Sequence, residues 1–112
     1  MNDKEFLKIA KSAMDSKKAS NIRCLKVDGV SSVADYFLLA SGNNAPQVKS
    51  IADEVDEKLS SNGREPTRTE GYKGANWIVL DYGSVIIHIF HKDTRNFYDL
   101  ERLWNDAEEI EL

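Results

Sequence analysis

The segment that most constrains the fold runs from Trp77 to Phe90 and holds two apolar runs, "WIVL" and "VIIHIF", with Asp-Tyr-Gly-Ser between them. Two apolar runs on either side of a tight polar turn predict a β-hairpin. A third run, "YFLLAS" at Tyr36–Ser41, is continuously apolar. Such a run is typical of an interior strand that is buried on both faces. The chain therefore predicts a sheet whose centre is covered, and helices are expected to cover it.

Two helices are predicted from apolar residues that recur at helical spacing. In the first, the stripe begins at Phe6 and continues through Ile9, Ala10 and Ala13. The second begins after Asn44, a good N-cap residue, and ends before Gly63. Its apolar stripe, at helical spacing, is Val48, Ile51, Ala52, Val55 and Leu59. Each helix therefore has one apolar face to pack on the sheet.

The remaining segments complete a single domain over residues 1–112. Ile22–Val27 is predicted as a strand, and Glu65–Glu70 as a strand near the sheet edge because of Pro66. The tail is expected to begin with a short amphipathic helix and to fray over residues 106–112. The apolar side of that helix would be Leu100, Leu103 and Trp104. The fold class predicted is α/β, with a single mixed β-sheet of about five strands flanked by helices.

The charge and cysteine content exclude several classes of protein. Fifteen basic residues are outnumbered by 19 acidic ones, giving a formal net charge of −4, which disfavours nucleic acid as the main partner. A basic protein is a better match. Cys24 is the single cysteine, so no internal disulfide is possible, and it is expected to be buried and inert. With no signal peptide and no apolar run of membrane length, a cytoplasmic protein is expected.

No metal or hydrolase site is predicted. His88 and His91 are three apart on a strand, so their side chains point to opposite faces. Ser84, His88 and Asp81 could form a triad on paper, but no nucleophile elbow accompanies them. We expect His88 to be a structural histidine with its hydrogen bonds satisfied.

Nucleotide chemistry is also disfavoured. The loop Ser41–Gln47 follows a strand and precedes a helix, so it could hold an anion, although ordinary helix capping is the favoured interpretation. A nucleotidyltransferase would place an Asp-x-Asp pair after Gly83-Ser84, whereas "VIIHIF" follows here. The missing acids argue against an enzyme, and no cofactor is predicted.

Aromatic residues gather in the last third of the chain, among charged ones. They are Trp77, Tyr82, Tyr98 and Trp104. Tryptophan and tyrosine are common anchors of protein interfaces. For Trp77, the sequence physics leaves an interface role and a core role equally open.

Three blocks of the sequence carry a family signature. They are "ADYFLLASGNNAPQVKSIADEV", "EGYKGANWIVLDYGSVIIHIF" and "RNFYDLERLW". In order and spacing they resemble the Iojap family, the bacterial ribosomal silencing factors called RsfS. The resemblance extends from the first helix to Trp104. The chain departs from the usual family form at Ser84, where an acid is common, and at Asn43-Asn44.

The resemblance implies a fold similar to nucleotidyltransferases without their catalytic acids. It implies binding to the fourteenth protein of the large ribosomal subunit, which blocks subunit joining and lowers translation when nutrients are short. Free members often form homodimers. The implied contact surface centres on Trp77, and we extend it to Glu70, Asp81, Tyr82 and Tyr98. The alternatives are a nucleotide-binding or residual nucleotidyltransferase module, and a dimeric scaffold without a ribosomal target.

Overall fold

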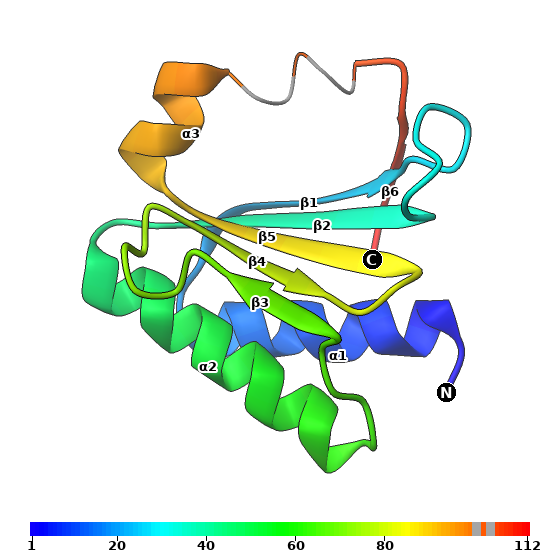
Figure 1. The fold of residues 1–112 in the computed structure, drawn as a ribbon, viewed down its shortest axis with the longest axis horizontal. Helices are drawn as coiled ribbons and strands as arrows, with labels where there is room; N and C mark the ends of the chain where they lie inside the picture. The colour runs from blue at the N-terminus through cyan, green and yellow to red at the C-terminus, as the bar shows by residue number, and fades with distance from the viewer. Residues whose placement is uncertain (100–101, 103–104) are drawn as a thin grey trace.

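The computed structural model describes residues 1–99, 102 and 105–112, and of Tyr98 the backbone alone. One six-stranded sheet has the order β3-β4-β5-β2-β1-β6, with two helices below it and a third above (Figure 1). The elements are α1 (Asp3–Ser16), β1 (Ser20–Lys26), β2 (Tyr36–Gly42), α2 (Ala45–Ser61), β3 (Arg68–Glu70), β4 (Trp77–Asp81), β5 (Val85–His91), α3 (Lys92–Tyr98) and β6 (Glu108–Ile110). The predicted α/β class is confirmed, with six strands instead of about five.

The sheet is mixed, as predicted. Its two central strands, β2 and β5, pair in parallel from Tyr36–Val85 to Gly42–His91. The other neighbours, β1–β2, β1–β6, β3–β4 and β4–β5, pair antiparallel. β4 and β5 form the predicted hairpin. β3 is shorter than the predicted strand and lies at the sheet edge, as Pro66 just before it suggested.

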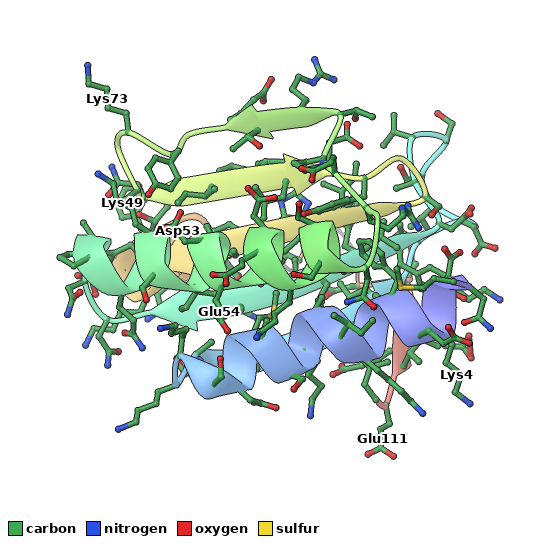
Figure 2. The ribbon with its side chains drawn as sticks, turned by 90° about the horizontal axis from the view of Figure 1, so that it is seen from below. Lys4, Lys49, Asp53, Glu54, Lys73 and Glu111 are labelled. Carbon is green, nitrogen blue, oxygen red and sulfur yellow. The ribbon has the colours of Figure 1, made fainter. Side chains whose placement is uncertain are left out.

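Both long helices lie side by side on one face of the sheet (Figures 1 and 2). The predicted N-cap of α2 is confirmed, because the Asn44 side chain accepts the backbone N–H of Gln47 at 2.8 Å. Asn2 caps α1 in the same way. Their outer surfaces carry acids and lysines intermixed, such as Lys4 and Glu54 (Figure 2). No described helix has the length and apolar character needed to cross a bilayer.

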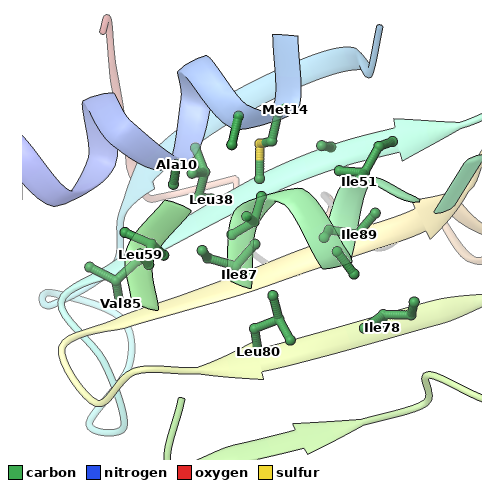
Figure 3. Packing of buried hydrophobic residues seen from close by; sticks show 14 of the residues in the cluster. Ala10, Met14, Leu38, Ile51, Leu59, Ile78, Leu80, Val85, Ile87 and Ile89 are labelled. Carbon is green, nitrogen blue, oxygen red and sulfur yellow. The ribbon is translucent and has the colours of Figure 1, made fainter. Parts of the chain in front are cut away.

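The core lies between these helices and the sheet (Figure 3). Met14 of α1 and Ile51 of α2 pack against Leu38 and Ile87 of the central strands, and each of the four has 0% exposure. Burying one such side chain stabilises the fold by roughly 1.5–3 kcal/mol. On β4, Ile78 and Leu80 belong to this core. Because side chains alternate along a strand, the residues between them face the other side.

That other side is partly covered by α3 (Figure 1). Arg95 anchors the helix: its side chain is buried and donates to the backbone oxygen of Asn21 at 2.8 Å and to Ser41 Oγ at 2.9 Å. A helix at the start of the tail was predicted, and it spans residues 92–98. The predicted apolar positions Leu100, Leu103 and Trp104 lie outside the described residues.

The prediction that residues 106–112 fray is wrong. Glu108–Ile110 form β6, which pairs antiparallel with β1 and sets Ile110 opposite Cys24. Arg23 and Glu109 add an ion pair of 2.7 Å across the two strands. The tail is ordered because it supplies hydrogen-bond partners to an edge of β1 that would otherwise be unpaired. Cys24 is buried as predicted, and burial, followed by the charge of Glu109, raises the pKa of its thiol to about 11.

Candidate functional site

Away from α3, the upper side of the sheet presents a mixed polar and aromatic surface. We call it the β4 face; it consists of Arg68, Glu70, Trp77, Val79, Asp81 and Ile86. The strand register brings these residues together, because Arg68 lies opposite Asp81, Glu70 opposite Val79, and Asp81 opposite Ile86. The two β3 residues are exposed and the other four are half-buried. The face is therefore accessible, and it sits on a rigid sheet.

Trp77 is the largest side chain of the β4 face. Its indole Nε1 donates a hydrogen bond to Nδ1 of His88 at 3.0 Å. Its ring also lies 5.3 Å, between centroids, from the ring of Phe90. The side chain is neither pure core nor free surface, since its N–H edge is held inward and the residue as a whole is only partly buried.

His88 is the buried partner of that tryptophan, with 7% of its surface exposed. The prediction of a buried, structural histidine is confirmed, and its Nδ1 has the indole of Trp77 as hydrogen-bond partner. Burial lowers its pKa to about 4, so the imidazole is neutral at physiological pH. A neutral ring that accepts at Nδ1 carries its proton on Nε2.

The loop before β4 fixes the position of the Trp77 backbone at the start of that strand. Gly71 has φ +79°, and a Cβ there would overlap the carbonyl oxygen of Trp77 and lie 3.2 Å from its carbonyl carbon. Only glycine fits so close an approach at a positive φ. Tyr72 then donates its hydroxyl to Asp53 at 3.1 Å and ties the loop to α2. The close approach of Gly71 and the hydrogen bond between Tyr72 and Asp53 thus both restrain the backbone that leads into Trp77.

The β4 face is less acidic than the sequence suggested, because Arg68 lies beside its two carboxylates. Arg68 lies 3.8 Å from a carboxylate oxygen of Glu70 and 3.8 Å from one of Asp81. Both pairs are exposed enough to contribute little to stability, about 0–1 kcal/mol each. The two carboxylates therefore remain available to a partner, with one guanidinium between them.

One of the predicted contact residues, Tyr82, does not join this face in the structure. Tyr82 has 5% exposure and packs edge-on against Phe6 of α1, with ring centroids 4.9 Å apart. It follows Asp81 directly, so its side chain takes the opposite, helix-covered side. Burial, and then the charge of Asp56, raises the pKa of its hydroxyl. Tyr98 ends α3, and its side chain lies outside the described residues.

The residues of the hypothetical triad are engaged separately. Ser84 Oγ donates to a carboxylate oxygen of Asp3 at 3.0 Å, Asp81 accepts the backbone N–H of the turn, and His88 accepts from the indole. His91 caps α3 by accepting the N–H of residue 93. Within the described residues, no three His, Cys, Asp or Glu side chains are grouped as metal ligands would be.

The loop before α2 is organised by capping. Besides the Asn44 cap, Gln47 accepts the backbone N–H of Asn43 at 2.6 Å. The amide nitrogen of Gln47 donates to the carbonyl oxygens of Lys17 and Lys18, both at 3.1 Å. The polar groups of this loop are thus used within the fold, which agrees with the capping interpretation.

Comparison with known proteins places the chain in a family. The family model described as "Ribosomal silencing factor during starvation" matches residues 1–112. The ribosomal silencing factor RsfS of Bacillus subtilis is 47% identical over 107 residues, which cover 96% of this chain and 91% of that protein. RsfS of Halalkalibacterium halodurans is 44% identical over 112 residues, 100% of this chain and 96% of that protein. A crystal structure of a protein from Bacillus halodurans superposes with a TM-score of 0.87 at 41% identity, covering 98% of this chain and 100% of that one. The chain therefore belongs to the ribosomal silencing factor family, a family of regulatory proteins and not of enzymes.

Proposed function

We propose that this protein binds the large ribosomal subunit through its β4 face and blocks joining of the small subunit, which represses translation under nutrient limitation. The proposed partner is the fourteenth protein of the large subunit. The observation that carries the proposal is Trp77, a half-buried tryptophan held in place on an accessible sheet face. Family membership supports the silencing role.

The energetics of the β4 face suit a protein partner. A fully exposed tryptophan offers roughly 150–250 Å² of surface. Only the smaller part of Trp77 remains accessible, so burying it contributes at most about 2 kcal/mol. Glu70 and Asp81 flank it and would orient a basic protein and speed its association. Val79 and Ile86 supply apolar contact between these polar groups. The arrangement is that of an interface with an aromatic anchor and a charged rim.

The proposed mechanism is steric and needs no chemical step. The domain measures 33 × 32 × 24 Å. When it is docked through the β4 face, its helix layer points away from the partner, because α1 and α2 cover the opposite side of the sheet (Figure 1). That bulk would occupy the space into which the small subunit moves. We further propose that the protein acts in the cytoplasm and forms a homodimer when free.

A Trp77→Ala variant tests the proposal. We expect its affinity for isolated large subunits to fall about 30-fold or more, as for truncation of an interface anchor. Co-sedimentation measures binding, and sucrose gradients measure formation of joined ribosomes. Val33→Ala is a matched control, because Val33 is 69% exposed and lies in the loop between β1 and β2.

The possible outcomes separate the parts of the proposal. If wild-type protein at micromolar concentration neither binds large subunits nor reduces joining, the proposed function fails. If wild-type protein binds and a folded Trp77→Ala variant binds equally well, the function stands but the β4 face is not the docking surface. Equal losses in both variants would show a general effect of truncation.

A further inference from the structure

We propose that His88 is a positioning residue for binding: it holds the indole N–H of Trp77 and so presents the ring to the partner in a single orientation. The inference rests on the proposed docking through the β4 face. It concerns a side chain that is itself 7% exposed and that a docked partner would barely touch. Its action would therefore pass through the tryptophan.

His88 is suited to this task because it is itself immobile. It lies on the central strand β5, with Leu39 of β2 and Val79 of β4 as its cross-strand neighbours. The ring of Phe37 meets it edge-on with centroids 4.8 Å apart. The ring of Phe90 lies nearly parallel to it, at 9° and 6.1 Å. Because these neighbours enclose the imidazole, its Nδ1 keeps one position. The hydrogen bond to Nδ1 therefore fixes the orientation of the indole relative to the sheet.

The indole is restrained on its other sides as well. Its ring lies 33° from the plane of Phe90, and the backbone of Trp77 is confined by the close approach of Gly71. The hydrogen bond to His88 fixes the remaining rotation about the side-chain torsions. Fixing a side chain before binding removes a cost that is otherwise incurred on association, and the gain for one side chain is roughly two- to tenfold in affinity.

The same bond decides which part of the indole a partner can meet. The N–H edge faces the buried imidazole, so the carbon part of the ring is what remains for a partner to meet. The donor is already satisfied, and docking would leave no unpaired N–H behind. We therefore expect the partner to pack on the ring of Trp77 and not to accept a hydrogen bond from it.

A double-mutant cycle tests the positioning role. The four proteins are wild type, Trp77→Ala, His88→Phe and the double variant, and binding to isolated large subunits is measured by fluorescence anisotropy with an N-terminal label. His88→Phe keeps an aromatic ring between Phe37 and Phe90 but removes the acceptor. We expect it to weaken binding two- to tenfold in the wild-type background. In the Trp77→Ala background, we expect it to have no effect.

A rescue variant separates the acceptor from the ring. In His88→Asn, the amide oxygen can take the place of Nδ1 while the imidazole is lost. We expect this variant to bind more tightly than His88→Phe. A purely structural role of the imidazole predicts the reverse order, because the phenyl ring preserves more of the packing. Thermal unfolding of each variant establishes that it is folded.

A measurement on the unmutated protein keeps the inference testable if His88→Phe does not fold. The indole N–H of Trp77, assigned by comparison with Trp77→Phe, should show slow hydrogen exchange by NMR. Fast exchange overturns the inference, as does an equal effect of His88→Phe with and without Trp77. Loss of binding in Trp77→Ala with unchanged binding in His88→Phe overturns the positioning role alone. Unchanged binding in Trp77→Ala overturns the proposed docking face instead.

Discussion

Replacing Gly71 with alanine should damage the fold far more than the same change at Gly63. Both glycines have a positive φ, +79° and +82°, so alanine at either position carries a backbone strain of about 1 kcal/mol. Within the described structure, a Cβ at Gly63 meets nothing within 4 Å. At Gly71 the Cβ would overlap the carbonyl oxygen of Trp77, which belongs to the backbone and cannot rotate away. We expect Gly71→Ala to lower the free energy of unfolding by roughly 3 kcal/mol or more, within the range for severe single mutations.

Urea unfolding followed by circular dichroism measures the difference between the two variants. A domain of this size typically has a free energy of unfolding of about 5–15 kcal/mol, so the loss at Gly71 should be easy to resolve. Because the clash acts on Trp77, its fluorescence spectrum should also change in Gly71→Ala and not in Gly63→Ala. Equal destabilisation in the two variants would refute the reasoning, because strain common to both would then explain the whole effect.

Three further predictions concern single side chains. Tyr82→Phe should raise the free energy of unfolding by up to about 1 kcal/mol, because its buried hydroxyl has no hydrogen-bond partner among the described residues; it should leave large-subunit binding unchanged, and weaker binding in sedimentation would return Tyr82 to the interface. The lowered pKa of His88, about 4, means that the unfolded chain takes up a proton that the folded chain does not, so stability present above pH 6.5 should be lost as the pH falls toward 4. The free energy of unfolding, measured by urea titration at several pH values in that range, should fall less steeply with decreasing pH in His88→Phe than in the wild type. Equal slopes in the two proteins would contradict the lowered pKa. Ile110→Ala should cost about 1–2 kcal/mol in urea unfolding, because Ile110 packs against the core, whereas a frayed tail predicts no change.

The sequence predicted those parts of the fold that are written in local patterns. Tyr36–Ser41 could be recognised as an interior strand because it is continuously apolar, and the start of α2 because Asn44 is a strong cap. The acidic tail gave no such signal. Its strand exists only because β1 offers an open edge, and Cys24 and Ile110, which pair there, are far apart in the chain.

The candidate site was predictable in part. Trp77 and Asp81 are four residues apart on one strand and so share a face, as the structure shows. Tyr82 was assigned to the same surface, although its odd separation from Trp77 already placed it on the opposite side. The bond between Trp77 and His88 depends on the hairpin register, which sets Val79 opposite His88. Register follows from the turn geometry and could not be read from composition or spacing alone.

The pairing of β6 with β1 also has a consequence during synthesis of the chain. β1 is made early, and its outer hydrogen-bonding groups have no neighbour until residues 108–110 have been translated. Until then the nascent domain carries an open strand edge, which is a template for pairing with other chains. β6 therefore closes an edge of β1 that stays open whenever residues 108–110 are missing, and a chain truncated before residue 108 should be prone to pair edge to edge with a second copy.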